Sequence, residues 1–472
     1  MRQKIWDFGH FKTNIAFRDE HGNELTYGQL EDEGNKLAEV LGRRRLVFVL
    51  CSNSIGSAFG YAAFLNNHIV PVMLNGHLEE ELLNSLMEVY KPPYLWVEDD
   101  RLSQFNSMKC VYKLYGYSLL KTDYDSEYPL YDNLALLLTT SGSTGSPKFV
   151  RQSYGNILAN TKSIVEYLNL SAIERPITTL PMNYTYGLSI INTHLYVGAT
   201  ILLTDKGLMQ KDFWEFFKRE NATSFGGVPY TYEMLDKLRF YKMDLPSLNT
   251  MTQAGGKITT ELHKKFADYA KEKNKNFVVM YGQCEATARM GYLPVEKASE
   301  KMGSMGIAIP GGVFRLIDSD GQEISQPDMA GELVYEGANV TLGYAEKGED
   351  LILEDERKGI LYTGDVAKFD EDGYYYIVGR MKRFLKIYGN RVNLDEMERL
   401  IKGGYDVEVA CAGIDDHMYI FLTNEANADA IKTFASAKTG LNPAAFTIKI
   451  IDEIPKNDSG KTQYKGLERY YE

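Results

Sequence analysis

The stretch Leu134-Ala-Leu-Leu-Leu-Thr-Thr-Ser-Gly-Ser-Thr-Gly-Ser-Pro-Lys148 decides how the rest of the chain is interpreted. Its apolar half, residues 134–138, is a short run bounded by turn residues, which predicts a strand in the interior of a sheet. The polar half places hydroxyl side chains beside glycines, whose backbone N–H groups can approach a ligand closely. Such a nest of donors beside one cation, Lys148, suits a polyphosphate.

This loop differs from the P-loop of NTPases, because Lys148 follows Pro147 and no Gly-Lys-Ser/Thr ending is present. A serine-rich loop by itself is more often an ordinary turn. Whether this loop binds phosphate must therefore be inferred together with the other segments of the chain.

Length and composition limit the class of protein. A chain of 472 residues is too long for one core and predicts two or three domains. Its 44% hydrophobic and 25% charged residues are typical of a soluble globular enzyme. The formal net charge of −12 argues against a nucleic-acid partner, which requires a basic face.

The cysteines and the first residues indicate the compartment. The four cysteines are far apart and form no CxxC pair, so neither a disulfide framework nor a zinc site is expected. Residues 1–10 contain no apolar signal region, and no run is long enough to span a bilayer. We therefore expect a cytoplasmic protein without a membrane span.

The first 300 or so residues alternate apolar runs with amphipathic stretches. Thr26-Tyr-Gly-Gln29 has the pattern of a capping box that opens a helix through Leu41. Strands are predicted at residues 46–50, 69–73, 134–140, 200–204, 223–227 and 277–281, separated by segments that fit helices. This alternation indicates parallel sheets covered on both faces.

From residue 303 the pattern changes to glycine-punctuated strands, at 312–318, 331–335 and 374–378. After the charged stretch 380–386, helices are predicted near 394–401 and 428–438, and strands near 407–412, 418–423 and 446–451. The predicted class is α/β, with a large N-terminal domain of parallel-rich sheets covered by helices at 1–380. A β-rich subdomain is expected at about 303–380, and a small mobile α/β domain at 381–472.

Four further segments carry residues suited to chemistry: Tyr281-Gly-Gln-Cys-Glu285, Tyr362-Thr-Gly-Asp365, the basic stretch 379–392, and Pro455-Lys-Asn-Asp-Ser-Gly-Lys461. The first places a carboxylate directly after a strand, where open α/β sheets bind ligands. Taken singly, each segment also fits a surface turn or a solvated charge. Their occurrence together, in one order, favours one functional site.

In this order the segments resemble the motifs of the adenylate-forming superfamily, which includes acyl-CoA synthetases, nonribosomal adenylation domains and firefly luciferase. Residues 139–148 resemble its phosphate loop, and 281–285 resemble its Tyr-Gly-x-Thr-Glu motif. Residues 331–333 and 337–344 resemble the next motif, and 362–365 a shortened Tyr-x-Thr-Gly-Asp. Residues 379–392 resemble the hinge segment, and 455–461 the C-terminal catalytic loop. The resemblance spans nearly the whole chain and points to stand-alone acyl-CoA synthetases and acyl–carrier-protein ligases.

The resemblance implies residues that bind ATP. Its phosphates would be held by Thr140, Ser141, Gly142, Ser143, Thr144, Gly145 and Lys148. The adenine would be framed by Gly255, Gly256, Tyr281 and Gly282, with Gln283 and Cys284 near the α-phosphate. Asp365 and Arg380 would hold the ribose hydroxyls.

It also implies catalytic and moving parts. Glu285 would bind Mg²⁺, and Lys461 would bridge the acyl carboxylate and the α-phosphate. Lys382 would be the hinge. After the domain rotates, Gly389 would line the thiol entrance and Lys386 would face the acyl adenylate.

The chemistry of adenylation requires these residue types independently of the family resemblance. A carboxylate that attacks a phosphate brings two anions together, so a cation must offset their repulsion. Magnesium neutralises the pyrophosphate and is bound by few protein carboxylates plus phosphate oxygens. Positioning supplies much of the remainder, which suits a lysine on a closing domain.

Two positions depart from the family pattern. Cys284 stands where Thr is usual, and since a thiol is a weak donor, its contact is expected to be weakened or assumed by Gln283. Such a cysteine is more often a small buried hydrophobe than a nucleophile. In the acyl-pocket segment 180–188, which includes Gly187, Tyr184 replaces the usual His. No aspartate is present there to bind the amine of an α-amino acid, which favours an acid without one.

We therefore expect an ATP-dependent acid–thiol ligase that forms an acyl adenylate and pyrophosphate and then transfers the acyl group to a thiol. Coenzyme A and the phosphopantetheine of an acyl carrier protein both fit as acceptor. The alternatives are amino-acid adenylation for a carrier protein, a phosphotransferase that releases ADP, and a non-catalytic nucleotide-binding protein. The presence of Glu285 and Lys461 argues against the last. No oligomeric state is predicted.

Overall fold

The computed structural model describes residues 4–42, 44–125, 128–139, 148–388, 390–456 and 462–471. The chain divides into two compact units, Met1–Val313 with Glu336–Leu361, and Phe314–Tyr335 with Tyr362–Glu472. Each unit is described by itself. Much of the expected β-rich segment shares a unit with the C-terminal part, and the expected boundary between residues 380 and 381 stays a prediction.

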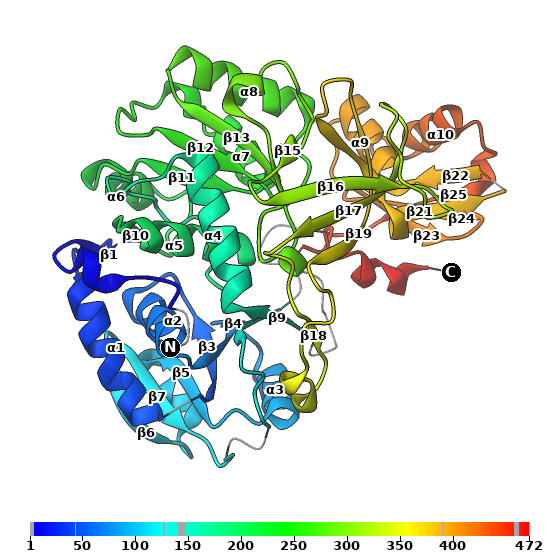
Figure 1. Ribbon diagram of the computed structural model, residues 1–472. Coiled ribbons are helices and arrows are strands. Elements are labelled where there is room, and N and C mark those ends of the chain that lie inside the picture. Colours follow the sequence, from blue (N-terminus) through cyan, green and yellow to red (C-terminus); the bar gives the residue numbers. More distant parts are fainter. Residues whose placement is uncertain are drawn as a thin grey trace. The chain divides into compact units, whose positions relative to one another are not determined.

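An eight-stranded mixed sheet forms one core of the first unit (Figure 1). Its central strands β8, β4, β3 and β5 are parallel, and antiparallel pairs extend it on both sides. Every residue of β3 is buried, and in β8 only Thr139 is partly exposed, as expected for apolar runs inside a sheet. In spatial order the strands are β18 (Gly343–Ala345), β9 (Phe149–Ser153), β8 (Leu134–Thr139), β4 (Val70–Asn75), β3 (Leu46–Cys51), β5 (Tyr94–Glu98), β7 (Tyr117–Lys121) and β6 (Lys109–Leu114).

Three helices accompany this sheet: α1 (Tyr27–Leu41), α2 (Ile55–Asn66) and α3 (Glu80–Tyr90). The predicted capping box opens α1, because Gln29 N–H donates to Thr26 Oγ1 at 3.2 Å and Thr26 N–H donates to Gln29 Oε1 at 2.9 Å. All 12 residues of α2 are buried. This helix shares one apolar core with α1 and with one face of the sheet.

A second sheet contains, in order, β11 (Ser224–Gly227), β12 (Thr250–Gln253), β13 (Asn276–Tyr281), β14 (Gly291–Tyr292) and β15 (Ile307–Ala308). Its first three strands are parallel, so their carboxyl ends lie at one edge. Residues 255–256 and 281–285 follow the neighbouring strands β12 and β13, and the topology therefore brings these predicted site segments to the same edge. The helices of this region are α4 (Tyr154–Leu168), α5 (Thr185–Val197), α6 (Lys211–Arg219), α7 (Pro229–Lys237) and α8 (Thr260–Glu272).

A small three-stranded sheet completes the strands of the first unit. Its order is β10 (Ile201–Leu203), β1 (Ile15–Asp19), β2 (Glu24–Thr26). Strands β1 and β10 are parallel although they lie far apart in the sequence. The N-terminal segment is thereby tied to the region that follows α5.

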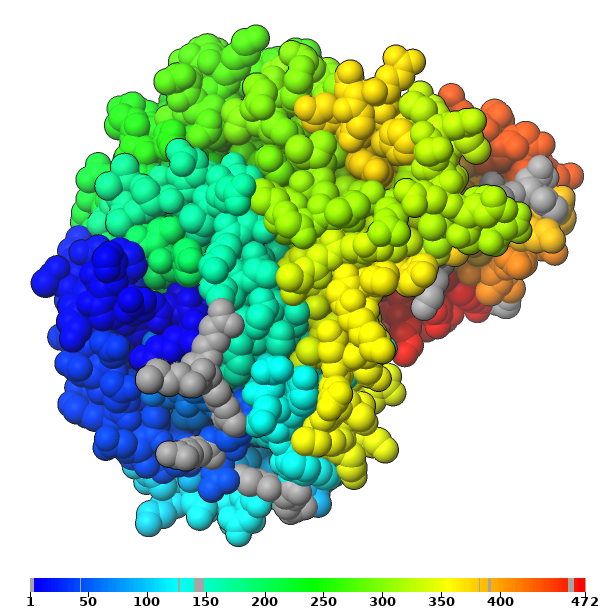
Figure 2. All heavy atoms as spheres, viewed as in Figure 1, coloured from blue at the N-terminus to red at the C-terminus, as the bar shows by residue number. Residues whose placement is uncertain are grey.

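The segment after residue 336 returns to the eight-stranded sheet. β18 pairs antiparallel with β9, and Tyr131 N–H donates to the carbonyl oxygen of Leu351 at 2.9 Å. Figure 2 shows this segment, in yellow, beside the cyan residues near 130. The motif 337–344 is therefore fixed next to β9, the strand that follows the serine-rich loop.

The second unit contains three further sheets. One is four-stranded, in the order β16 (Gly312–Ile317), β17 (Gly331–Gly337), β19 (Ile360–Phe369), β20 (Tyr375–Arg380). A hairpin of β21 (Phe384–Ile387) and β22 (Asn390–Asn393) precedes the third sheet, β23 (Val409–Ile414), β24 (His417–Leu422) and β25 (Phe446–Ile450). Helices α9 (Leu394–Gly404) and α10 (Ala428–Thr439) share its apolar core.

The predicted strands and helices are present within a few residues of their expected bounds, and the α/β class is confirmed. The sequence patterns did not predict several strands, among them β12 of the second sheet and the antiparallel pair β6 and β7. No residue of β6 is buried. Among the residues that the structure describes, no helix has the length and apolar character required to cross a membrane.

Candidate active site

Glu285, the predicted magnesium ligand, stands in a turn directly after β13. Tyr281 ends the strand, and the chain turns through Gly282 into a 3₁₀ helix at Cys284–Ala286. A Cβ at position 282 would lie 1.7 Å from the carbonyl oxygen of Ala288, so only glycine fits this turn. The Tyr-Gly pair thus places Glu285 at the ligand-binding edge of the parallel strands.

Hydrogen bonds fix both the backbone and the carboxylate of Glu285. The hydroxyl of Tyr344 donates to Glu285 Oε1 at 2.8 Å. The carbonyl oxygen of Glu285 accepts from Thr341 N–H at 3.0 Å and from the Thr341 hydroxyl at 2.9 Å. Arg357 Nη1 donates to the same carbonyl oxygen at 3.3 Å. The carboxylate therefore has a defined direction, as a metal ligand requires.

Lys148 reaches the same group of residues from the start of β9. Its ammonium lies 3.5 Å from the centroid of the Tyr344 ring and 3.5 Å from Glu346 Oε1. The guanidinium carbon of Arg357 lies 4.6 Å from the Tyr344 centroid. Burial, followed by the charge of Glu285, raises the pKa of Tyr344, so its hydroxyl stays protonated and can donate.

These residues fit magnesium in one particular way. Mg²⁺ beside a nucleotide is usually held by one or two protein carboxylates together with phosphate oxygens. Within the described residues, no group of three or more His, Cys, Asp or Glu side chains could hold a metal ion. Glu285, half-buried and fixed in direction, fits an ion shared with a polyphosphate and does not belong to an all-protein metal cage.

The predicted adenine residues follow the ends of β12 and β13. Gly255 has φ of 83°, in the left-handed region that favours glycine, and Gly256 is exposed. The side-chain amide of Gln283 donates to the Tyr281 hydroxyl at 3.3 Å. Cys284 is 7% exposed, in keeping with a small buried side chain.

The predicted acyl-pocket residues lie at the start of α5. Tyr184 is the N-cap residue of this helix and is buried, which raises the pKa of its hydroxyl. A Cβ at Gly187 would lie 2.4 Å from the carbonyl oxygen of Pro181, so glycine lets the helix approach that segment. Tyr184 belongs to what we term the tyrosine cluster, which consists of Leu180, Tyr184, Tyr186, Val228, Ala254, Val278 and Met280, with Tyr167, Leu168, Ile190 and Tyr292 partly buried around it.

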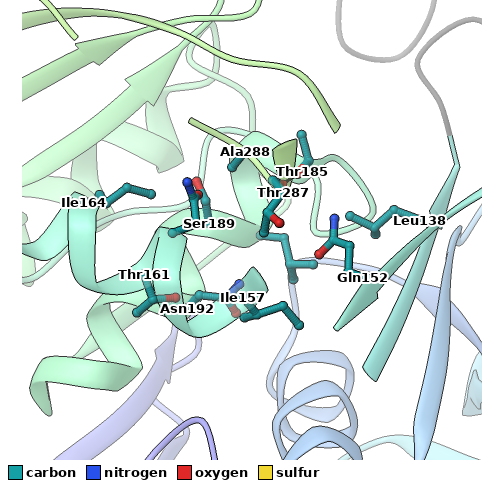
Figure 3. A pocket seen from close by; sticks show the side chains of 12 residues that line it. Leu138, Gln152, Ile157, Thr161, Ile164, Thr185, Ser189, Asn192, Thr287 and Ala288 are labelled. Carbon is teal, nitrogen blue, oxygen red and sulfur yellow. Dashed lines mark hydrogen bonds between the residues drawn. The ribbon is translucent and has the colours of Figure 1, made fainter. Parts of the chain in front are cut away.

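A separate small cavity lies between α4, α5 and the loop at Thr287 (Figure 3). The cavity leaves about 10 Å³ in which the centre of a water molecule can lie. That is room for about one water molecule. Its lining mixes polar side chains, such as Gln152 and Asn192, with apolar ones, such as Leu138 and Ile157, and the cavity is too small for an acyl group.

In the second unit, Asp365 and Arg380 are directly opposite each other on β19 and β20. Arg380 Nε lies 3.3 Å from Asp365 Oδ1, and the Asp365 side chain is only 5% exposed. Gly364, with φ of 69°, precedes the aspartate. The structure therefore brings together the two residues predicted to hold the ribose.

The predicted hinge residue, Lys382, lies in the 3₁₀ turn Met381–Arg383. Its neighbour Arg383 is anchored, since Nη2 donates to Glu398 Oε1 at 2.6 Å and the guanidinium carbon lies 3.6 Å from the Tyr464 ring centroid. Tyr464 donates to Glu398 Oε2 at 3.0 Å. Residues next to the predicted hinge and after the predicted catalytic loop thus contact the same carboxylate.

The remaining predicted residues are Lys386, which is exposed, and those that the structure does not describe. Lys386 is exposed on β21, where its N–H donates to Asp415 Oδ1 at 2.8 Å. Outside the described residues lie Thr140, Ser141, Gly142, Ser143, Thr144, Gly145, Gly389 and Lys461, and their roles stay predictions.

Three residues around Glu285 had no assigned role in the sequence interpretation: Thr341, Tyr344 and Arg357. Thr341 and Tyr344 lie in the motif 337–344. The motif indicated that this segment is functional, but the sequence did not predict that its residues contact Glu285. Arg357 lies outside every motif, and only the fold brings it to the Glu285 carbonyl.

Comparison with known sequences identifies relatives of this chain. Feruloyl-CoA synthase from an Amycolatopsis species is 29% identical over 346 residues, which are 70% of this chain and 68% of that protein. 2-Succinylbenzoate–CoA ligase from Bacillus pumilus is 26% identical over 93% of this chain and 91% of that protein.

Solved structures share the fold. o-Succinylbenzoate CoA synthetase (MenE) from Bacillus subtilis, in complex with the acyl-adenylate intermediate OSB-AMP, matches with a TM-score of 0.79 at 21% identity over 98% of both chains. ATP-bound MatB from Rhodopseudomonas palustris matches with a TM-score of 0.79 at 20% identity over 99% of both chains. Both confirm the predicted fold. The sequence model described as AMP-binding enzyme matches residues 7–345, so this chain belongs to the AMP-binding enzyme family, as its motifs predicted.

Proposed function

We propose that this chain is an ATP-dependent acid–thiol ligase. A carboxylate oxygen of the acid attacks the α-phosphorus of ATP, the bond to the bridging oxygen breaks, and pyrophosphate leaves. A thiol sulfur then attacks the acyl carbon of the adenylate, loses its proton to solvent, and AMP leaves. The acid and the thiol thus form a thioester at the expense of one ATP.

The observation that carries this proposal is the fixed carboxylate of Glu285 in contact with Tyr344, over whose ring Lys148 lies. When bound, Mg²⁺ would neutralise the leaving pyrophosphate, and Glu285 is the residue that would hold it. Lys148 directly follows the serine-rich loop and supplies a cation for the phosphates. A polyphosphate is therefore the ligand that suits this part of the first unit.

For the second unit we propose that Asp365 and Arg380 hold the ribose hydroxyls. Their ion pair gives the buried aspartate side chain a defined direction. We further propose that Lys461 offsets the charge that develops on the α-phosphate, that Lys382 is the hinge, and that Lys386 and Gly389 serve the thiol step. These roles derive from the family motifs.

Coenzyme A is the acceptor that we propose first, because the curated relatives above are named as CoA synthases and ligases. The phosphopantetheine of a carrier protein is the second. The absence of aspartate from residues 180–188 supports an acid without an α-amino group. We also propose a cytoplasmic location, supported by four free cysteines, of which three are buried.

The test is pyrophosphate–ATP exchange with a panel of carboxylic acids, together with identification of the nucleotide product. An acid–thiol ligase exchanges pyrophosphate and forms AMP, whereas a phosphotransferase forms ADP. Glu285→Gln should reduce exchange by about 10²-fold or more, since it removes the charge that holds the metal. Glu349→Gln, at an exposed position of the same unit, is the matched control and should leave exchange unchanged. ADP as the only product would contradict the proposal.

A further inference from the structure

The described residues include three buried arginines: Arg151, Arg289 and Arg383, which are 0%, 3% and 8% exposed. Arg151 forms an ion pair with Glu356, and Arg383 pairs with Glu398 at 2.6 Å. No carboxylate of the described chain forms an ion pair with Arg289. A buried charge is costly unless it is paired, and among the described residues Arg289 differs from the other two in having no carboxylate as a counter-charge.

The described groups that contact the Arg289 side chain are neutral. Its guanidinium carbon lies 3.9 Å from the centroid of the Tyr186 ring, and its Nε donates to Met280 Sδ at 3.4 Å. The hydroxyl of Tyr167 lies 3.1 Å from the same sulfur. Burial raises the pKa of Tyr186 to about 12, and the positive charge of Arg289 opposes that rise. The Tyr186 ring face, the Met280 thioether and a hydrogen bond with the Tyr167 side chain satisfy part of the guanidinium, but none of these described groups carries a compensating charge.

The backbone of Arg289 is held firmly, so the side chain starts from a fixed point. Asn160 Nδ2 and Asn339 Nδ2 each donate to the Arg289 carbonyl oxygen at 2.9 Å. Arg289 N–H donates back to Asn160 Oδ1 at 3.3 Å. The turn before it contains Thr287 with φ of 65°, an uncommon conformation for a β-branched residue. Such a cation is pre-organised, which lowers the cost of binding an anion.

Arg289 contacts two members of the tyrosine cluster. Tyr186 and Met280 belong to that cluster, as does Tyr184, whose ring centroid is 6.3 Å from that of Tyr186. The charge of Arg289 also opposes the rise in the pKa of Tyr184 that burial causes. The buried cation is therefore beside the residue that we predict to contact the acyl group.

We infer that the acid activated by this enzyme carries a second carboxylate, and that Arg289 binds this second carboxylate while the first reacts with ATP. The inference rests on the function proposed above and narrows its substrate to dicarboxylic acids. A carboxylate matches the guanidinium fork in two parallel hydrogen bonds and supplies the missing charge. The same cation repels a protonated amine, in agreement with the absence of aspartate from residues 180–188.

The wild-type enzyme tests this directly with acid pairs in which a carboxylate replaces a terminal methyl group. The pairs are succinate and butyrate, adipate and hexanoate, and terephthalate and 4-methylbenzoate. In pyrophosphate exchange we expect kcat/KM for the diacid of at least one pair to exceed that of its partner by about tenfold to a hundredfold, the range of a charge-assisted hydrogen bond. Equal or reversed values in all three pairs would overturn the inference.

Two variants separate recognition from structural support. Arg289→Met should lower kcat/KM for the preferred diacid by the same factor and leave the monoacid and the KM for ATP unchanged. Arg289→Lys should restore part of the preference, because it keeps the charge and loses the fork. Arg239→Met, the same change at an exposed position, should behave as wild type. An equal loss of kcat/KM for diacid and monoacid in Arg289→Met would show that Arg289 only supports the structure and would overturn the inference.

Binding without ATP distinguishes this inference from the proposed function. Succinate, adipate and terephthalate are each added without ATP. At least one of them should raise the Tm of the wild type and leave that of Arg289→Met unchanged. If no acid supports exchange but this Arg289-dependent rise occurs, the proposed function fails and the dicarboxylate site stands. If exchange occurs and neither its preference nor the Tm shift depends on Arg289, the function stands and the site is refuted.

Discussion

The ammonium of Lys148 lies 3.5 Å from the centroid of the Tyr344 ring, and the hydroxyl on that ring donates to Glu285. One aromatic side chain thus contacts both the cation after the serine-rich loop and the predicted metal ligand. A cation over a ring gains roughly 0.5–2 kcal/mol, and a hydrogen bond to a charged group roughly 1.5–3 kcal/mol. Tyr344 holds the two charges in place without neutralising either.

Tyr344→Phe should weaken metal-dependent activity. The change removes the 2.8 Å hydrogen bond to Glu285 and keeps the ring under Lys148. We expect the Mg²⁺ concentration for half-maximal pyrophosphate exchange to rise by about tenfold, since ~1.4 kcal/mol corresponds to a factor of ten. Tyr112→Phe removes a comparable hydroxyl, 3.3 Å from Glu33 Oε2, and should change nothing. Identical Mg²⁺ curves for both variants would remove Tyr344 from the site.

Asp365→Asn should weaken ATP binding, because the ribose hydroxyls would lose a charged acceptor. A charge-assisted hydrogen bond is worth roughly 1.5–3 kcal/mol, so the KM for ATP should rise by about tens-fold. Asp328→Asn is the matched control: it removes an exposed carboxylate that pairs with Lys368 at 2.6 Å in the same unit. An unchanged KM for ATP in Asp365→Asn would exclude this aspartate from nucleotide binding.

Lys461→Ala and Lys382→Pro should damage different half-reactions. Loss of a cation that acts in the transition state of adenylation costs about 10²–10³ in rate, so Lys461→Ala should block adenylate formation and spare thiolation of a supplied acyl adenylate. Proline at 382 fixes φ in the turn Met381–Arg383 and prevents the change that a hinge requires. Adenylation should then survive and thioester formation should fail.

Each half-reaction of these two variants is measured separately, pyrophosphate release for the first and thioester yield from supplied adenylate for the second. Lys449→Ala, on β25 of the same unit, is the control for loss of a lysine. Equal losses in both half-reactions for both variants would refute the alternation of two conformations.

His194, on α5, should make stability depend on pH. It is 4% exposed, and burial lowers its pKa from 6.5 to about 4. Between these values the unfolded chain binds more protons than the folded chain, so this contribution is present above pH 6.5 and is lost as the pH falls toward 4. Between pH 7 and pH 5 the free energy of unfolding should decrease by about 2 kcal/mol more in wild type than in His194→Gln. Parallel pH curves from urea unfolding would contradict the assignment.

The sequence predicted those parts of the fold that depend on local pattern. The apolar runs of β3, β4 and β8 and the capping box of α1 each lie in one short segment, where period and turn residues suffice. Strand β6 has no buried residue and lies at the edge of its sheet, next to β7, so no apolar period indicated it. Its place in the sheet depends on a partner that the local sequence does not name.

The site divides in the same way. Glu285 was predictable because its motif is contiguous, whereas its hydrogen bond to Tyr344 joins residues that are 59 positions apart. Arg289 was not predicted, because a single arginine after a motif is usually solvated and only burial without a carboxylate distinguishes it.

The turn that begins at Gly282 has a consequence for engineering. Any Cβ at position 282 would collide with the Ala288 carbonyl, and Asn160 and Asn339 hold the Arg289 carbonyl at the other end. The main chain between Gly282 and Arg289 cannot change its conformation without displacing Glu285. A designer who wants a different acid therefore has side chains to exchange, Arg289 first, on a backbone that must be left as it is.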